Sequence, residues 1–302
     1  NVFPEVCGRV CPQDRLCEGN CVVEQAGFGA ITIGNLEKYL TELAWEKGWV
    51  KNIENNNSVN KKVAIIGSGP AGMAASSYLI QNGYQVDVFE KHDRVGGLMI
   101  YGIPNFKLDK SIVERRTEWL ANSGVNFYVN KEIGKDVSFQ DLEKDYDAIL
   151  VATGVYKARK LDIETSNINN SLPALDFLIE SNKVGLGDAP SSNKNLSAKD
   201  KHIVVIGGGD TAMDCVRTAI RQKAREVTCL YRRNKENMPG SAREVLNAEQ
   251  EGVKFNWLSV PSKIISENFE ASILSYKVAT LGEADETGRR KPVDTGIEKQ
   301  IK

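Results

Sequence analysis

The chain has 302 residues, of which 41% are hydrophobic and 26% are charged, and its formal net charge is −1. A chain of this length can bury one or two domain cores, and its balanced charge gives no reason to expect a nucleic acid or a membrane surface as partner. No apolar stretch approaches the roughly 20 residues that a membrane span needs. We therefore expect a soluble, cytoplasmic enzyme core.

The first 34 residues are rich in turn residues and hold most of the cysteines. A disulfide framework is disfavoured there, because no signal peptide is visible and the rest of the chain is typical of an intracellular nucleotide enzyme. A zinc site fits the number of thiols, but their spacings contain no CxxC knuckle. Iron–sulfur ligation also suits soft thiolates. These interpretations concern Cys7, Cys11, Cys17 and Cys21, whereas buried structural thiols fit Cys215 and Cys229 better.

A helix is predicted over residues 36–47, where leucine and tyrosine recur at helical spacing. Trp45 and Trp49 lie four residues apart around the end of this helix, which favours a packing role over a cofactor site. The polar run at 52–58 predicts a linker.

A nucleotide-binding motif then occurs twice. Val63–Gly72 consists of an apolar run, a Gly-rich turn and a helix-forming stretch, and Ile203–Ala212 repeats that order. In such a motif the first Gly permits the tight turn, the second lets the backbone approach a pyrophosphate, and the third lets helix and strand pack closely. The phosphates bind the free N–H groups of the helices, which are predicted over 73–81 and 212–222. One chain with two dinucleotides indicates electron transfer between them.

The residues after the second strand of each motif differ. Glu90 ends the first, where a carboxylate can accept hydrogen bonds from both ribose hydroxyls and would exclude a 2′-phosphate. Arg232 and Arg233 end the second, where two guanidinium groups suit a phosphate. The first site is therefore predicted to take FAD or NAD, and the second NADP(H).

FAD is favoured at the first site by two later segments. Residues 94–98 and 101–108 form a Gly-containing stretch that can wrap a second cofactor surface, and residues 147–154 predict a buried strand that ends in small residues. This combination resembles the two-dinucleotide flavoprotein reductases. The fold class expected is α/β, with two Rossmann-like dinucleotide-binding domains preceded by a small helical and loop-rich Cys module.

The remaining predicted elements lie between and after the two motifs. Helices are expected near 109–123, 138–144 and 241–251, a Pro/Gly/Ser/Asn-rich crossover at 155–200, strands at 254–258 and 272–280, and disorder beyond Gly282. The expected domains are an Fe–S module at 1–50, a linker at 51–60, part of the FAD domain with its crossover at 61–200, and the NADPH domain at 201–302.

Six segments together are similar to the small (β) subunits of NADPH-dependent glutamate synthase: Pro4–Cys21, Gly34–Glu37, Gly207–Arg217, Tyr231–Arg233, Glu236–Glu244 and Gly282–Arg290. In that family NADPH gives a hydride to FAD, and electrons pass singly through two [4Fe-4S] clusters to the FMN of a large (α) subunit. That subunit makes L-glutamate from glutamine and 2-oxoglutarate. The resemblance implies that Cys11 and Cys17 serve one cluster and Cys21 the other, with Glu37 a candidate non-thiolate ligand and Cys7 of doubtful role.

Two cubanes need eight protein ligands, and the family has further cysteines upstream of Cys7 and a flavin segment beyond residue 302. The chain is therefore expected to be an internal fragment of a longer subunit, with clusters that it cannot complete alone. No catalytic side chain is expected, because hydride transfer is the cofactors' own reaction. The alternatives are a related flavin and Fe–S reductase, of the ferredoxin:NADP or dihydropyrimidine dehydrogenase type, and a non-enzymatic scaffold.

The predicted contact residues fall into two groups. For FAD they are Gly67, Ser68, Gly69, Pro70, Ala71, Gly72, Glu90, Lys91, Gly97, Leu98, Lys107, Ala152, Thr153 and Gly154. For NADPH they are Gly207, Gly208, Gly209, Asp210, Thr211, Ala212, Arg232 and Arg233.

Overall fold

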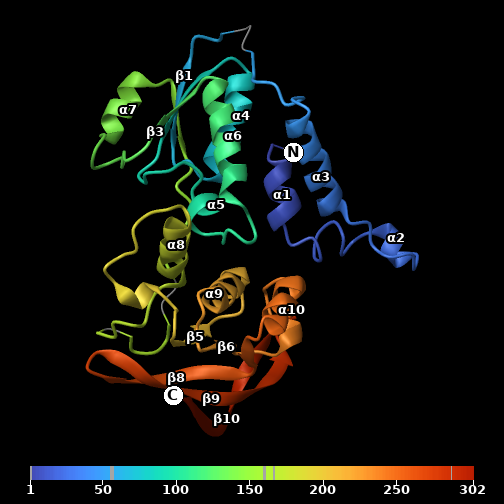
Figure 1. Ribbon diagram of the computed structural model, residues 1–302, viewed down its shortest axis with the longest axis vertical. Coiled ribbons are helices and arrows are strands. Elements are labelled where there is room, and N and C mark those ends of the chain that lie inside the picture. The colour runs from blue at the N-terminus through green and yellow to red at the C-terminus, as the bar shows by residue number, and fades with distance from the viewer. Residues whose placement is uncertain (1, 55–57, 159–160, 166, 287) are drawn as a thin grey trace. The chain divides into compact units, whose positions relative to one another are not determined.

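The computed structural model describes residues 2–54, 58–158, 161–165, 167–286 and 288–302. The chain divides into two compact units, Asn1–Tyr156 and Lys157–Lys302 (Figure 1). Residues 55–57 of the predicted linker lie outside the described residues. Within the described parts of the chain, no helix is both long and apolar enough to cross a membrane.

The cysteine module begins the first unit with α1 (Pro4–Val10), α2 (Val22–Gln25) and α3 (Ile33–Glu46). Helix α1 packs on α3, and Gly8 makes the close approach possible. A Cβ on Gly8 would lie 2.8 Å from the carbonyl oxygen of Gly34 and 2.9 Å from the amide nitrogen of Lys38. Because both neighbours are backbone atoms, any larger residue at position 8 would separate the two helices.

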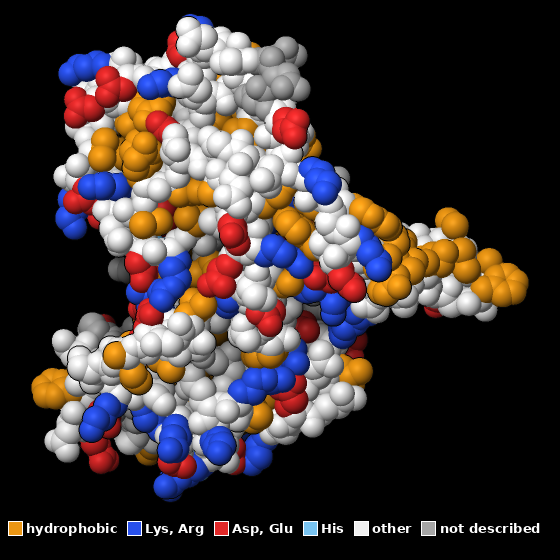
Figure 2. Space-filling view, turned by 45° about the horizontal axis from the view of Figure 1, so that its top comes forward, with side chains coloured by type: hydrophobic (Ala, Val, Ile, Leu, Met, Phe, Trp, Pro, Cys, Tyr) orange, Lys and Arg blue, Asp and Glu red, His pale blue; other side chains and the backbone are white. Residues whose placement is uncertain are grey.

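The predicted helix at 36–47 is confirmed, but its apolar stripe faces solvent. Leu36, Tyr39 and Leu40 are 50%, 64% and 60% exposed, because α3 turns its other face toward α1. Figure 2 shows hydrophobic side chains gathered over the part of the unit formed by α2 and α3. The packing role predicted for the tryptophans holds for Trp45, which lies against arginine side chains of a later helix, but Trp49 is 66% exposed.

A four-stranded parallel sheet forms the rest of the first unit, in the order β3-β2-β1-β4. Its strands are β1 (Lys62–Ile66), β2 (Gln85–Phe89), β3 (Val125–Tyr128) and β4 (Ala148–Val151). The helices are α4 (Pro70–Gln81), α5 (Leu98–Tyr101), α6 (Lys110–Asn122) and α7 (Phe139–Asp145). Since β1 is central and its neighbours run parallel to it, the residues after β1, β2 and β4 meet at one edge of the sheet.

Strand β4 corrects one prediction. Residues 148–151 form a strand as expected, but it is exposed rather than buried: Leu150 is 39% and Val151 62% exposed. An apolar run alone predicts burial on both sides. In the structure β4 is the edge strand of the described sheet and pairs only with β1, so much of its surface lacks a neighbour.

The second unit opens with α8 (Ala174–Gly185), a helix that the sequence did not predict within the crossover. A second parallel sheet comes next in the order β5-β6-β7, from β5 (His202–Ile206), β6 (Glu226–Leu230) and β7 (Lys254–Asn256). Helices α9 (Asp210–Arg221) and α10 (Ala242–Gln250) lie within the same unit. Short 3-10 turns cover Lys194–Leu196 and Lys235–Asn237. The core of this unit packs Met213, Val216 and Val245 around β6.

An antiparallel sheet completes the described chain, with β8 (Ser259–Glu267), β9 (Glu270–Ala284) and β10 (Arg290–Ile301) in the order β10-β9-β8. The disorder predicted beyond Gly282 is therefore wrong. Nearly every residue of β10 is exposed, so the strand has no alternating apolar signal that a sequence pattern could detect. Backbone pairing with β9, reinforced by the Lys277–Asp294 ion pair at 2.7 Å, forms it instead.

Candidate functional site

The first Gly-rich turn lies at the carboxyl edge of the first sheet, between β1 and α4. Gly67 has φ +103°, and a Cβ there would lie 2.5 Å from the carbonyl oxygen of Ala152. A Cβ on Gly72 would lie 2.0 Å from the carbonyl oxygen of Gly67. By contrast, a Cβ on Gly69 would meet no described atom within 4 Å. Two glycines are thus required by the fold itself, and the middle one borders open space at the start of a 12-residue helix.

Glu90 lies under this turn rather than out in solvent. Its side chain is 5% exposed. One carboxylate oxygen accepts from the Ser68 amide at 3.0 Å and the Ser68 hydroxyl at 2.6 Å, and the other accepts from the His92 amide at 2.9 Å. These described donors leave room among the roughly four acceptor positions of a carboxylate. Glu90 therefore ties the end of β2 to the Gly-rich turn.

A second turn, at Gly96 and Gly97, closes on the first. The Gly96 amide donates to the Ser68 hydroxyl and carbonyl oxygens, both at 3.2 Å. Gly97 has φ +54°, and a Cβ there would lie 2.7 Å from the Cα of Gly69. The structure thus brings the segments 67–72, 90–91, 97–98 and 152–154 together. Lys107 lies half-buried in the loop after α5.

The loop after Gly97 has a support that sequence reasoning missed. Lys110 is 4% exposed, and its ammonium group donates to the carbonyl oxygens of Met99 (2.9 Å) and Ile103. These carbonyls lie at the end of α5, where a cation is favoured. A lysine in the first turn of a predicted amphipathic helix gives no sequence signal for such a role.

The second Gly-rich turn, between β5 and α9, also links a strand to a helix, but different residues surround it. Gly207 has φ +150°, and a Cβ on Gly208 would lie 2.4 Å from the ring of Tyr231. A Cβ on Gly209 would meet no described atom within 4 Å. Tyr231 is fixed by its hydroxyl, which donates to the carbonyl oxygen of Asn237 at 2.9 Å.

The segment before α10 joins this turn and was not among the predicted site residues. The Gly240 amide donates to the Gly208 carbonyl oxygen at 2.8 Å, and the Ser241 amide donates to the Asp210 carboxylate at 2.9 Å. Asp210 thus holds α10 rather than projecting alone from the helix. The Pro-Gly-Ser signal of residues 239–241 marks a turn, but nothing local shows which surface that turn contacts.

The two arginines lie at the end of β6. Arg232 is exposed, and Arg233 is half-buried. Within the described residues, the Nε atom of Arg233 is buried and has no hydrogen-bond partner. A buried guanidinium N–H without a partner costs free energy, so an anionic group bound at this point would satisfy it. The Gly209 opening and this atom both fit a phosphorylated dinucleotide.

The predicted metal ligands lie in the cysteine module. Burial, then the neighbouring Cys7 thiol, Glu37 and Cys17, raises the pKa of the Cys11 thiol. These four groups are thus electrostatic neighbours. Cys21 is not among the groups that shift the pKa of Cys11. Hydrogen bonds from the backbone of Ile31 and Glu24 lower the pKa of the Cys21 thiol.

No three His, Cys, Asp or Glu side chains in the described parts gather tightly enough to hold one metal ion. A zinc site is such a single-ion centre, whereas a four-iron cubane takes one ligand at each iron and spreads its thiolates farther apart. The soft donor set of the module fits the second kind of group. Cys215 and Cys229 are buried in the second unit, and burial raises the pKa of both thiols, that of Cys229 to about 12, which suits structural roles.

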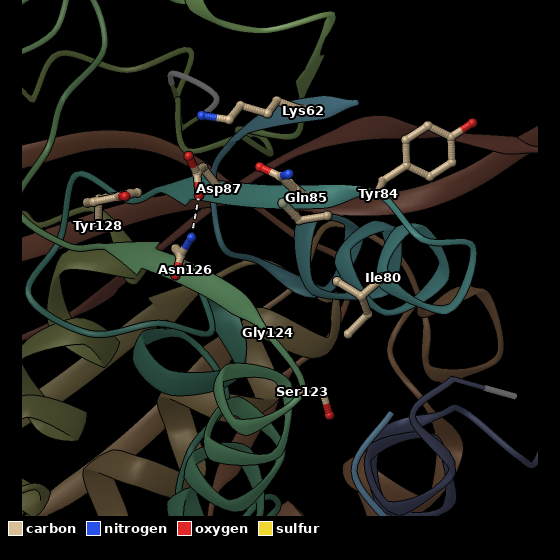
Figure 3. Close-up of a pocket in the computed structure, with 10 residues that line it drawn as sticks. Lys62, Ile80, Tyr84, Gln85, Asp87, Ser123, Gly124, Asn126 and Tyr128 are labelled. Atoms are coloured by element: carbon tan, nitrogen blue, oxygen red, sulfur yellow. Dashed lines mark hydrogen bonds between the residues drawn. The ribbon is translucent and has the colours of Figure 1, made fainter. Parts of the chain in front are cut away.

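A separate hollow of about 340 Å³ lies on the first unit, lined by residues of β2, β3 and the turns before them, with Lys62 of β1 and Ile80 of α4 (Figure 3). Asp87 accepts there from the Asn126 amide at 2.7 Å. Its lining contains no residue of the segment 67–72. The hollow is therefore distinct from the dinucleotide site.

Comparison with known proteins agrees with this geometry. Residues 61–296 match the family described as pyridine nucleotide-disulphide oxidoreductase, and residues 1–49 match the family described as dihydropyrimidine dehydrogenase domain II, 4Fe-4S cluster. The chain belongs to the pyridine nucleotide-disulphide oxidoreductase family. It thus has the FAD- and NADPH-binding fold of flavoprotein oxidoreductases, preceded by a 4Fe-4S domain.

Its relatives place it among the small chains of glutamate synthase. It is 53% identical over 294 residues to the glutamate synthase [NADPH] small chain of Azospirillum brasilense, covering 97% of this chain and 61% of that protein. It is 52% identical to the putative glutamate synthase [NADPH] small chain of Cereibacter sphaeroides, covering 96% of this chain and 70% of that protein. The chain thus spans between three fifths and three quarters of the length of these relatives.

Solved structures confirm the fold class. FprA from Mycobacterium tuberculosis in complex with NADPH matches with a TM-score of 0.65 and 19% identity, over 80% of this chain and 68% of that chain.

Proposed function

We propose that this protein is the electron-input chain of a glutamate synthase. It oxidises NADPH, passes the hydride and its two electrons to FAD, and delivers electrons singly through [4Fe-4S] clusters to the FMN of a large (α) chain. That chain makes L-glutamate from glutamine and 2-oxoglutarate. The cytoplasm is the proposed location.

The observation that carries the proposal is the contrast between the two Gly-rich turns. The first turn is bonded to a buried carboxylate, Glu90, whereas Arg232 and Arg233 follow the second strand of the other motif, and the Nε of Arg233 has no hydrogen-bond partner among the residues that the structure describes. A carboxylate suits free ribose hydroxyls and repels a 2′-phosphate, whereas guanidinium groups bind that phosphate. A flavin reductase specific for NADPH requires two dinucleotide sites, of which only one accepts a 2′-phosphate.

The proposed role of the chain's own residues is to bind FAD and NADPH and to orient them. Gly69 and the first turn of α4 would hold the FAD pyrophosphate, and Gly209 with the first turn of α9 would hold that of NADPH. Glu90 would accept from the FAD ribose while it fixes Ser68 and the turn. Hydride transfer is chemistry that the cofactors supply, and the protein contributes alignment and exclusion of water.

The cysteine module would hold the iron–sulfur group. Cys11 and Cys17 are the proposed ligands of one cluster, with Glu37 as a candidate non-thiolate ligand, and the electrostatic interactions of the Cys11 thiol with Cys17 and Glu37 support this grouping. Cys21 is the proposed ligand of a second cluster, as the family resemblance implies, and neither Cys11 nor Cys17 is among the groups that shift the pKa of its thiol.

The related proposal is that a ferredoxin or a pyrimidine takes the electrons. It draws support from the name of the family that matches residues 1–49. The two proposals share the path of electrons from NADPH through FAD to the iron–sulfur clusters and differ only in the electron acceptor.

The test is an anaerobic absorbance titration of the full-length protein with NADPH, with flavin and iron analysed in the same sample. Bleaching of a flavin band, with iron near the roughly eight atoms that two cubanes contain, supports the path from NADPH to Fe–S. NADPH-dependent glutamate formation on adding the large chain then identifies the acceptor. Bound flavin without iron would reduce the proposal to a diaphorase, and a protein with neither cofactor would refute it.

A further inference from the structure

A single buried arginine of the nucleotide-binding domain is the centre of the contact with the cysteine module. The guanidinium of Arg116, on α6, donates to both carboxylate oxygens of Glu5 on α1, at 2.6 and 2.9 Å. The side chains are 8% and 0% exposed. Because these residues lie 111 positions apart, the pair joins two segments that only the fold brings together.

Aromatic rings from three segments surround the same guanidinium. Its carbon lies 4.7 Å from the ring centroid of Trp119, 5.2 Å from that of Trp45 and 5.8 Å from that of Phe3. A guanidinium over aromatic faces gains cation–π attraction when water is excluded. The rings thus bring α3 and the start of the chain into the contact that Arg116 makes with α1.

A second, more exposed layer of charges surrounds this centre. Arg115 donates to both oxygens of Glu42 on α3, each at 2.9 Å, and Arg9 on α1 donates to the same carboxylate at 3.0 Å. Glu42 therefore links α1, α3 and α6. Figure 1 shows α1 and α3 beside α6.

The placement of the thiols gives this contact a functional meaning. Cys7 lies two residues after Glu5 on α1, and Cys11 is the residue at which that helix ends. On the other side, α6 packs on β3 and α4 of the sheet that carries the first Gly-rich turn. The Glu5–Arg116 pair thus connects the thiol-bearing helix to the domain proposed to bind flavin.

We infer that Glu5 and Arg116 are a positioning pair, which holds the thiol-bearing helix α1 at a fixed distance and angle from the flavin domain for electron transfer. The inference rests on the proposed function. Apolar surfaces tolerate small sliding movements, but a bidentate pair has one geometry and keeps its energy only in that geometry. Electron transfer between bound groups falls steeply with distance, so the pair acts on the exit of electrons from flavin and not on flavin reduction by NADPH.

The test compares variants of the full-length, cofactor-loaded protein in complex with its large chain. Arg116→Met leaves Glu5 as an unpaired buried charge, Arg116→Lys keeps the charge without the fork, and Glu5→Leu with Arg116→Met removes both charges. Lys61→Met is the matched control, because its ion pair with Asp147 at 2.6 Å belongs to the same domain but is exposed. The readouts are amide exchange of residues 5–10, flavin reduction by NADPH, and electron delivery to the large chain.

In Arg116→Met we expect amide exchange in α1 to rise by about tenfold or more. We also expect electron delivery to fall by about tenfold or more through misplacement, and flavin reduction to stay within about twofold. Arg116→Lys should be intermediate. The double variant should recover both exchange protection and electron delivery, because no buried charge remains unpaired. If Arg116→Met does not fold, the other two variants carry the comparison.

Unchanged electron delivery despite faster exchange in α1 would show that the pair is only structural and would overturn the inference. Equal losses in flavin reduction and electron delivery would overturn it as well, since they indicate damage to the whole domain. A wild-type protein whose flavin is not reduced by NADPH would instead refute the proposed function.

Discussion

Replacing Gly69 by Ala separates the demands of cofactor binding from those of folding. Gly69 is the N-cap of α4 with φ −65° and ψ −177°, a backbone conformation open to any residue. A Cβ there meets no described atom within 4 Å. The added methyl group therefore enters only the space proposed for the FAD pyrophosphate.

The expected effects on stability and on affinity differ in size. Gly→Ala at an unstrained position stabilises by about 0.4–1 kcal/mol through the unfolded chain, and Ala in place of Gly at an N-cap costs a similar amount. We expect the free energy of unfolding of the flavin-free protein to change by no more than about 0.5 kcal/mol. Displacing the phosphate loses at least one charge-assisted hydrogen bond, about 1.5–3 kcal/mol, so the FAD Kd should rise by roughly tenfold to more than a hundredfold.

Gly72→Ala is the contrasting variant. Its Cβ would lie 2.0 Å from a backbone carbonyl oxygen that cannot move freely. We expect a loss of stability of about 1–3 kcal/mol or more from overpacking. Urea unfolding of the flavin-free proteins and titration with FAD, monitored by flavin fluorescence, measure both quantities. Wild-type FAD affinity in Gly69→Ala would refute the placement of the phosphate beside Gly69, and a loss of stability as large as in Gly72→Ala would refute the claim that its surroundings are open.

Three further predictions concern charges. Replacing Arg232 and Arg233 with Met should raise the Kd for NADPH by roughly tenfold or more and leave that for NADH within about twofold, as measured by isothermal titration; equal losses would place the 2′-phosphate elsewhere. Hydrogen bonds from Arg115 hold the pKa of Glu42 below its ordinary value of 4.5, so its stabilising effect is present above pH 4.5 and is lost as pH falls through the lowered pKa. Glu42→Gln should therefore lower the free energy of unfolding by about 1 kcal/mol at pH 7, and the difference from wild type should shrink in urea melts near pH 4. Glu90→Gln should destabilise the flavin-free protein by about 1.5–3 kcal/mol, because one amide N–H₂ replaces an acceptor that buried N–H groups need; an unchanged urea midpoint would contradict the hydrogen bonds between Glu90 and the turn.

The predicted cofactor residues came from local patterns that the structure brings together. A strand, a Gly-rich turn and a helix form one continuous segment, and their order specifies where backbone N–H groups are free. Gly72 and Gly207 meet these requirements within their own segments, whereas the space around Gly67 is limited by the distant residue Ala152. The contacts of these residues with bound nucleotides stay predictions, as do the domain boundaries.

Contacts between distant segments left no comparable signal. Tyr231 walls the second turn, and Gly240 binds its backbone, but neither is marked by spacing. The apolar stripe of α3 was predicted from helical periodicity, which specifies that residues share a face but not what that face contacts. Strand β10 escaped prediction for the related reason that its partner, not its own composition, forms it.

Short stretches of sequence were enough to specify the two nucleotide-binding turns, the contrast between a carboxylate and two arginines, and the presence of a thiol-rich module, because each depends on residues within one segment. Folding alone put Glu90 under its turn, Glu37 near Cys11, and Arg116 of α6 against α1. These features escape local patterns because burial and ion pairing depend on what lies across the space between segments. Arg116 and Glu5 are 111 residues apart in the sequence, and they form a buried ion pair only when folding brings them together and removes the water between them.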